Sequence, residues 1–193
     1  MKRVCEGDES AYRLLVSRHI DSIARYTMRL LNGRRDYEDI SQEVFLKLWL
    51  KAKTWNPRSA KLSTWLHRIA FNLCMDYFRR PSQRESHSEL KESDIDSAQA
   101  SDEIRTDIEQ QFGQLNKLIS GLPESQRSAM ALVYQQSFSN KEASEIMSIS
   151  VKALESLLSR SRKTLRVLVS PESSKIETIS SFEIKEEIYA KQN

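Results

Sequence analysis

The stretch SNKEASEIMSISVKALESLLSRSRKTLRVLV, residues 139–169, predicts two helices joined by a tight turn. Ser139 can cap a short helix over Asn140–Met147, and Ser150 can cap a longer helix that begins at Val151. A side-chain oxygen just before a helix accepts a hydrogen bond from one of the free amides of the first turn, which is why serine is favoured there. A short helix, a turn and a long helix in this order indicate a helix-turn-helix.

The long helix has an apolar side and a basic side. Spacings of three, four and seven residues place Val151, Leu154, Leu158 and Leu165 on the side that we expect to be buried. The opposite side carries the residues predicted to contact DNA, and Glu155 is the one acid among them. These are Lys152, Ser156, Ser159, Arg160, Lys163 and Arg166. A basic face on the second helix of such a pair is typical of major-groove readers, although the last two cations also suit the helix dipole and some helix-turn-helix pairs bind only protein.

The rest of the chain is also predicted to be helical. Glycine and proline number only four each among 193 residues, and the apolar residues recur at helical rather than alternating spacing. We expect helices over residues 10–31, 37–53 and 63–80, with Ser63 capping the third. No strand is expected, so the predicted fold class is all-α.

The pattern divides the chain into two small helical domains joined by a flexible acidic linker. The first domain is predicted at residues 1–80, and the linker at 81–103 has too few large apolar side chains to fold alone. Helical spacing resumes at residue 104, so the domain with the helix-turn-helix is predicted at 104–170. The hydrophobic content of 39% supports two small cores as well as it supports one large core. The apolar residues of the tail at 171–193 do not recur at a regular helical or strand spacing, and we assign the tail no role.

The second predicted helix has apolar residues on two sides. One set is expected to pack inward, and it consists of Ile40, Val44, Phe45 and Leu48. Leu46 and Leu50 fall on the opposite side, together with Asp39, Gln42 and Glu43. An apolar face with an acidic rim fits a protein partner, but the same two leucines could equally be covered by other parts of the domain.

The third predicted helix carries a polar stripe opposite its apolar side. Arg68, Asn72, Asp76 and Arg79 share one face, whereas the inner side is expected to hold Trp65, Ile69, Leu73 and Tyr77. Such a stripe could meet a DNA backbone and base edges, or it could simply face solvent. The three tryptophans, at 49, 55 and 65, are expected in the core rather than as platforms for stacked bases.

Several function classes lack support in the sequence. Cys5 and Cys74 have no second Cys or His at metal-ligand spacing, so neither a disulfide framework nor a zinc site is expected. The three histidines are scattered, and no glycine-rich phosphate loop or nucleophile elbow is present, so we expect no enzyme activity and no cofactor. No apolar run approaches the roughly 20 residues that span a bilayer, which predicts a soluble protein of the cytoplasm.

Five segments resemble, in the same order, the conserved regions of extracytoplasmic-function sigma factors of bacterial RNA polymerase. In the first half these are GDESAY at 7–12, YEDISQEVFLKLW at 37–49 and STWLHRIAFNL at 63–73. In the second half they are LPESQR at 122–127 and LSRSRKTL at 158–165. An unrelated helix-turn-helix activator or repressor would reproduce only the second half. A helical nucleic-acid enzyme would need clustered carboxylates, whereas the acids at 36–43 are spread along a helix.

The resemblance implies a role in transcription initiation and a role for each predicted surface. Asp39, Gln42, Glu43, Leu46, Trp49 and Leu50 fall where the family grips the clamp helices of the largest polymerase subunit. The loop TWNPRSAKL at 54–62, with Asn56, Arg58 and Lys61, falls beside Arg68, Asn72, Asp76 and Arg79 where the family captures the unpaired minus-ten element. Arg127 and the basic helix fall where the family reads the minus-thirty-five element.

Opening of the duplex would then draw its energy from binding one strand, without hydrolysis. The implied partners are core RNA polymerase (clamp helices and flap), promoter DNA and an anti-sigma factor that can be membrane-anchored, with no small-molecule substrate. Where the family often has Gly in the helix-turn-helix turn, this chain has Ser148, and residues 153, 155 and 157 also depart from the family pattern. The promoter sequence is therefore not predicted.

Overall fold

The computed structural model describes residues 1–32, 36–80 and 117–168, and every regular element in these ranges is helical. The predicted linker, residues 104–116 at the start of the predicted second domain, and the tail lie outside the described residues. The elements are α1 (Lys2–Cys5), α2 (Glu9–Leu30), α3 (Asp36–Lys51), η1 (Ala52–Thr54), α4 (Leu62–Arg79), α7 (Glu124–Met130), η3 (Ala131–Gln135), α8 (Asn140–Met147) and α9 (Val151–Leu168). The all-α fold class is confirmed.

Local hydrogen bonds explain where α2, α8 and α9 begin. The Asp8 carboxylate accepts from the Ala11 amide at 2.9 Å at the start of α2. Ser139 and Glu142 form a reciprocal capping box at the start of α8, and the Ser150 hydroxyl accepts from the Ala153 amide at 3.1 Å. The predicted caps of α8 and α9 are therefore confirmed.

The predicted cap of α4 is wrong. The helix begins at Leu62, one residue before Ser63, and Lys61 is its N-cap without a side-chain hydrogen bond. Ser63 lies inside the first turn, and its backbone oxygen is 2.9 Å from Nδ1 of His67. α1, with buried Val4, is a further element that the sequence analysis did not predict.

The helix-turn-helix is present, and its turn has a left-handed residue. Ser148 closes α8 with φ of 56°, a conformation that glycine adopts at lower cost than any other residue. Before it, α7 continues into a single π-helical stretch, η3, in which the Gln136 amide donates to the carbonyl of Ala131 at 2.9 Å. A π turn adds one residue to the helical repeat and so rotates the residues that follow it.

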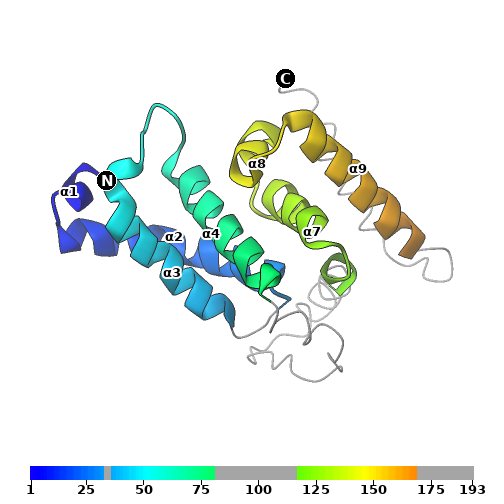
Figure 1. Ribbon diagram of the computed structural model, residues 1–193, viewed down its shortest axis with the longest axis horizontal. Coiled ribbons are helices and arrows are strands. Elements are labelled where there is room, and N and C mark those ends of the chain that lie inside the picture. Colours follow the sequence, from blue (N-terminus) through cyan, green and yellow to red (C-terminus); the bar gives the residue numbers. More distant parts are fainter. Residues whose placement is uncertain (33–35, 81–116, 169–193) are drawn as a thin grey trace, which may run out of the picture.

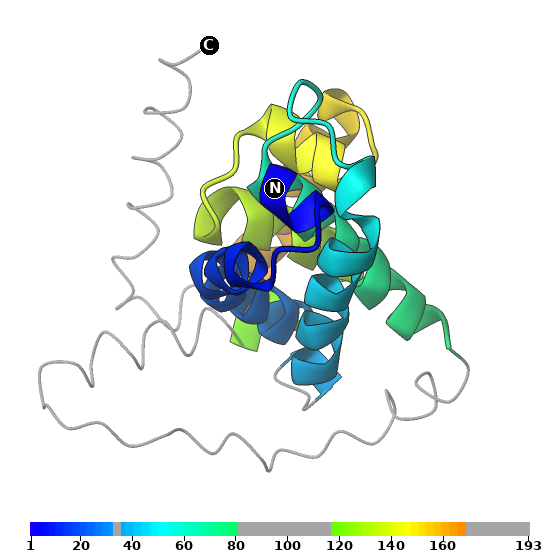
Figure 2. The same cartoon turned by 90° about the vertical axis from the view of Figure 1, so that its left-hand side faces the viewer.

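The two halves of the chain pack against each other (Figure 1). Helices α1–α4 form one side and α7–α9 the other, with α4 against α8 and α9 on the outer edge. Figure 2 looks from the side of α1 and α2 and shows α7–α9 behind them. Buried side chains from both halves join in one cluster, with Ile23 and Leu66 from the first and Leu132 and Ile146 from the second. The two small cores that the composition of the sequence allowed are therefore joined into one buried cluster.

Candidate nucleic-acid and polymerase interfaces

The outer face of α3 is apolar and open to solvent. Leu46 is 54% exposed and Leu50 is 69% exposed, while Ile40, Val44, Phe45 and Leu48 are buried on the opposite side. The alternative that other described parts of the domain cover Leu46 and Leu50 is therefore wrong. The polar residues beside them remain accessible, because Asp39 and Gln42 are exposed. Glu43 forms an ion pair with Lys47, at 3.1 Å within the same helix.

Trp49 differs from the other residues predicted for this face. Its ring packs edge-on against Tyr12 with 5.1 Å between centroids, and the Tyr12 hydroxyl donates to the carbonyl of Phe45 at 3.2 Å. Trp49 is half-buried, so part of its area holds α2 on α3 and only the remainder faces outward. The outer face consists mainly of Leu46 and Leu50 with their acidic rim.

The polar stripe of α4 lies on the surface as predicted. Arg68, Asn72, Asp76 and Arg79 are all exposed, and Leu73 and Tyr77 on the inner side are buried. Asp76 and Arg79 are 3.6 Å apart within the same helix. An ion pair between exposed groups is weak, about 0 to 1 kcal/mol, so it leaves both side chains available to another partner.

A pocket of about 330 Å³ lies between the loop at 54–62 and the start of α4. Its wall consists of Thr54, Trp55, Asn56, Ser59, Ala60, Thr64, Trp65, Arg68 and Glu145. The hydroxyl of Thr64 and the indole N–H of Trp55 are buried here, and neither has a hydrogen-bond partner among the described residues. Trp55 and Trp65 are half-buried in the pocket wall, so the expectation that they belong to the core is only partly correct.

Two of the loop residues predicted to bind DNA already have partners. The Asn56 side-chain oxygen accepts from the Arg58 amide at 3.0 Å, which leaves its amide group free to donate. Lys61 Nζ is 2.9 Å from Oε1 of Glu142 in α8. Arg58 is exposed on the same loop.

Glu142 is held ionised by its surroundings. Partial burial favours the neutral acid, but the hydrogen bonds from Lys61 and from the amide and hydroxyl of Ser139 outweigh it and lower the pKa of the Glu142 carboxyl. Glu145 lies one turn further along α8 and reaches the same pocket. Neither acid was among the predicted site residues, because only their position beside a loop distant in the sequence brings them to the pocket.

The basic side of α9 is exposed along its length. The six residues predicted for it, at 152, 156, 159, 160, 163 and 166, all face solvent, while Leu154, Leu158 and Leu165 are buried. Val151 was expected inside but is 40% exposed at the first turn. An apolar side chain at this end of a recognition helix can contact a thymine methyl group, so Val151 joins the candidate base-reading residues.

Arg127 is a correction to the predicted DNA contacts. It is only 4% exposed, and its guanidinium donates to the carbonyls of Leu30 and Leu122 and to the side-chain oxygen of Asn32. A buried cation with three acceptors cannot also reach a phosphate in this arrangement. Arg127 joins the second half of the chain to the end of α2.

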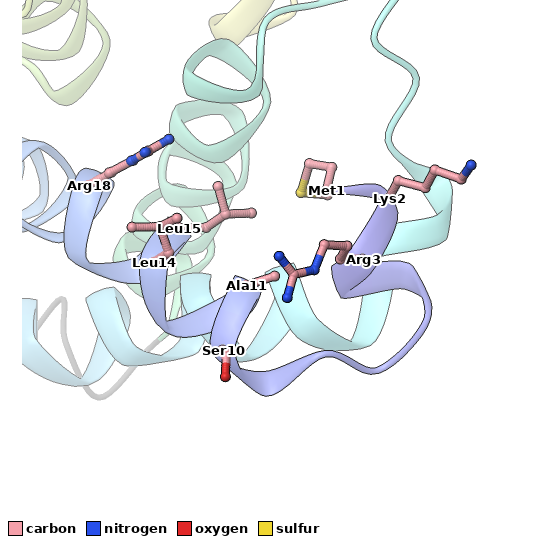
Figure 3. Close-up of a pocket in the computed structure, with 8 residues that line it drawn as sticks. All are labelled: Met1, Lys2, Arg3, Ser10, Ala11, Leu14, Leu15 and Arg18. Carbon is pink, nitrogen blue, oxygen red and sulfur yellow. The ribbon is translucent and has the colours of Figure 1, made fainter.

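A second groove, of about 520 Å³, lies between α1 and the start of α2 (Figure 3). Leu14, Leu15 and Met1 line its apolar part, with Arg18 toward one end, Lys2 toward the other and Arg3 between them. None of the predicted site residues contributes to it. No group of three or more metal-binding side chains occurs among the described residues, and no helix there is long and apolar enough to cross a membrane.

Two family models and several individual proteins match this chain. Sigma-70 region 2 matches residues 15–85, and Sigma-70 region 4 matches residues 112–165. The sigma-E factor of Escherichia coli strain K12 is 30% identical over 186 residues, covering 89% of this chain and 93% of that protein. SigW of Bacillus subtilis strain 168, also an extracytoplasmic-function sigma factor, is 28% identical and covers 86% and 92%.

Two solved structures share the fold. The sigma factor RpoE of Bartonella quintana, in complex with the anti-sigma factor NepR, has a TM-score of 0.65 at 22% identity and covers 82% of this chain and 96% of that one. CnrH in complex with the cytosolic domain of CnrY has a TM-score of 0.63 at 22% identity and covers 87% and 93%. With both sigma-70 regions matched in order and a relative at 30% identity over most of its length, the chain belongs to the extracytoplasmic-function RNA polymerase sigma factors.

Proposed function

We propose that this sigma factor divides transcription initiation among three surfaces. The outer face of α3 binds the clamp helices of core RNA polymerase, the loop at 54–62 with α4 captures the minus-ten strand, and α9 reads the minus-thirty-five element. The observation that carries the proposal is the exposure of Leu46 and Leu50 beside acids on α3. An ordinary helix-turn-helix regulator has no need of such a face, whereas a subunit of polymerase does.

Strand capture supplies the energy for opening the duplex. Extruding a base costs a few kcal/mol, and a pocket that binds the base offsets this cost. The Thr64 hydroxyl and the Trp55 indole support this role, because each is buried in the pocket without a partner among the described residues. A base edge would restore hydrogen bonds worth about 1 to 3 kcal/mol. Arg58 and Lys61 would hold the neighbouring phosphates.

Along α9, base reading and phosphate binding occupy different turns. We assign Lys152, Ser156 and Arg160 to the bases, because the N-terminal half of a recognition helix enters the major groove. Lys163 and Arg166 neutralise phosphates, which makes that part of the affinity dependent on salt. Ser159 is placed between the two groups.

The proposal also covers the division of the chain into domains and its control by a partner protein. The proposed domains are residues 1–80 and 104–170, with 81–103 as linker and the tail at 171–193 without a role. The protein performs no chemical step of its own and works in the cytoplasm. An anti-sigma factor controls it, and the complex of the sigma factor RpoE with the anti-sigma factor NepR, which shares the fold, supports this proposal.

The test is run-off transcription with purified core polymerase, across a promoter library that varies each position of the minus-ten element. We expect specific transcripts with the wild-type chain, and Thr64→Val should reduce them about tenfold or change the preferred base while core binding stays intact. Ser17→Ala, which removes an exposed hydroxyl from α2, is the control and should match wild type. Unchanged output and preference in Thr64→Val would remove the pocket from the proposal, and no wild-type transcript would refute the function.

A further inference from the structure

The groove between α1 and α2 has an apolar floor that none of the three proposed surfaces uses. Met1, Leu14 and Leu15 form this floor, and Leu14 is 50% exposed although its side chain is entirely apolar. Met1 and Leu15 also pack against the buried core, so the floor is continuous with the packed interior. An exposed apolar surface with a charged rim is typical of a site that binds another segment of protein.

The rim of this groove is basic. Figure 3 shows Arg18 toward one end, Lys2 toward the other and Arg3 between them. Arg3 pairs with Asp8 at 2.6 Å, but neither Lys2 nor Arg18 forms an ion pair within the described residues. None of the residues that line the groove is acidic. The groove therefore favours an apolar segment that also carries acids.

Charge distinguishes the groove from the other exposed apolar surface, the outer face of α3. Leu46 and Leu50 are as exposed as Leu14, but their neighbours include the acids Asp39 and Glu43. A segment with an excess of acids is repelled by the rim of the α3 face and attracted by the rim of the groove. The two surfaces therefore select different partners.

The C-terminal tail of this chain contains a segment of the required composition. Residues 182–188 read FEIKEEI, in which Phe182, Ile184 and Ile188 are large and apolar and three acids accompany one lysine. The predicted linker at 81–103 is also acidic, but it has few large apolar side chains. Of these two acidic segments, only the tail can fill an apolar groove.

The tail is also long enough to reach the groove from the end of α9. Ile188 lies 20 residues beyond Leu168, and an extended chain of this length spans about 65 Å. That is about twice the rise of roughly 33 Å along the 22 residues of α2, the longest described helix. A segment of the same chain is present at an effective concentration on the order of 1 mM, so even weak affinity for an open groove suffices.

We propose that the groove between α1 and α2 binds the chain's own C-terminal tail. The apolar side chains of residues 182–188 lie on Leu14 and Leu15, and the acids of the same segment lie beside Lys2 and Arg18. The tail, which has no part in the proposed function, thus covers exposed apolar side chains at the start of α2. The contact is independent of the three surfaces proposed above, so it can be tested without polymerase or DNA.

The test measures how close the tail lies to α2 in the full-length chain. A nitroxide spin label is attached at Gln192→Cys, with Cys5→Ser to remove the accessible thiol, while Cys74 is buried. The nuclear magnetic resonance intensities of the backbone amides of residues 10–18 are compared between the oxidised and the reduced label. An unpaired electron broadens the signals of nearby amides, so a docked tail lowers these intensities.

Two matched pairs of variants separate the groove from the rest of α2. Leu14→Gln changes the floor, and Ile20→Gln is its control, because both side chains are about half exposed and only Leu14 lines the groove. Arg18→Glu changes the rim, and Arg25→Glu is its control, because both arginines are exposed on α2 and the change in net charge is the same. Circular dichroism establishes that all four proteins remain folded.

We expect the amides of residues 10–18 to be about threefold weaker with the oxidised label in the wild-type chain and in both controls. Leu14→Gln and Arg18→Glu should each restore most of this intensity. The proposal is overturned if the wild-type chain shows no broadening at residues 10–18, or if both groove variants broaden as their controls do. Broadening confined to residues 151–168 would overturn it as well, because the tail would then lie on the basic side of α9.

A mixing experiment distinguishes the chain's own tail from that of a second copy. Isotope-labelled chain without a spin label is mixed with spin-labelled chain that carries no isotope, so that only contacts between molecules broaden the observed signals. We expect no broadening in the mixture. Broadening of residues 10–18 equal to that within one chain would assign the groove to a second copy and overturn the proposal.

Discussion

Arg127 and Arg160 carry the same guanidinium in opposite surroundings. Arg127 is buried and donates to backbone carbonyls at the junction of the two halves, so its guanidinium binds groups inside the fold. Arg160 is exposed on α9, where its Nε donates to the carbonyl of Ser156 in the same helix, at 3.2 Å. A contact of this kind is readily exchanged for a base edge. Sequence position alone made both residues DNA contacts, and burial separates them.

Replacement of Arg160 by alanine should reduce holoenzyme binding to the preferred minus-thirty-five duplex by about 1 to 3 kcal/mol, because a bidentate contact to guanine is lost. Fluorescence anisotropy against duplexes that vary one base pair at a time gives the measurement. Arg166→Ala is the comparison variant and should weaken all duplexes alike while making the salt dependence shallower. If Arg160→Ala also weakens all duplexes alike, Arg160 is a phosphate contact.

At the scale of the element, α3 shows how one helix presents two different apolar faces. Its buried side holds the first domain together, and its outer side leaves two leucines more than half exposed. Helical periodicity predicts both sides, since residues 46 and 50 fall opposite residues 44 and 48. What periodicity could not decide was whether another element covers the outer side, because that depends on where α2 and α4 pack.

Charge reversal on α3 should separate polymerase binding from folding. We expect Asp39→Lys with Glu43→Lys to weaken co-purification with core polymerase at least tenfold, because the new lysines replace the acidic rim of the outer face. Asp21→Lys, an exposed acid of α2 outside that face, is the control and should co-purify as wild type. Circular dichroism establishes that all three proteins remain folded. Wild-type co-purification of the double variant would show that the polymerase binds elsewhere.

At the scale of the whole molecule, His67 connects the stability of the packed halves to pH. The ring is buried between Tyr26 and Phe138, and Nε2 is 3.4 Å from the Ser22 hydroxyl. Burial lowers the pKa of His67 to about 4; the backbone carbonyl of Ser63 opposes this shift and the nearby His19 adds to it. The folded protein therefore holds this histidine neutral at the centre of the interface.

The stability of the protein should fall as the pH is lowered from about 6.5 toward 4. Between these values the unfolded chain binds a proton at residue 67 that the folded chain does not, so acid favours unfolding by up to about 3 kcal/mol. Urea denaturation at a series of pH values measures this loss. His67→Gln should have a shallower slope over the same window, even if it is less stable at pH 7.5. An equal slope in both proteins would assign the acid sensitivity to other groups, of which His19, with its pKa also lowered by burial, is the first candidate.

The sequence by itself determined the features that depend on neighbours within a few residues. The capping of α8 and α9, the helical class and the buried leucines of α9 all follow from hydrogen bonds and periodicity that act over one or two turns. Five short segments in a fixed order also determined the family. Two predictions at helix ends were wrong by about one residue or one turn: Ser63 does not cap α4, and Val151 is exposed in the first turn of α9. The ends of helices are harder to predict, because they depend on how the preceding loop approaches the helix.

Only the tertiary structure decided how the two halves meet. Arg127, Gln136 and Glu142 look like ordinary surface residues in the sequence, and their partners Leu30, Ser22 and Lys61 lie roughly 80 to 115 positions away along the chain. No local pattern encodes such pairs, because the free energy of a contact depends on the burial and geometry that the whole fold imposes. The sequence therefore predicted the candidate surfaces of this sigma factor, and the packing of α8 on α4 decided how its two halves are arranged.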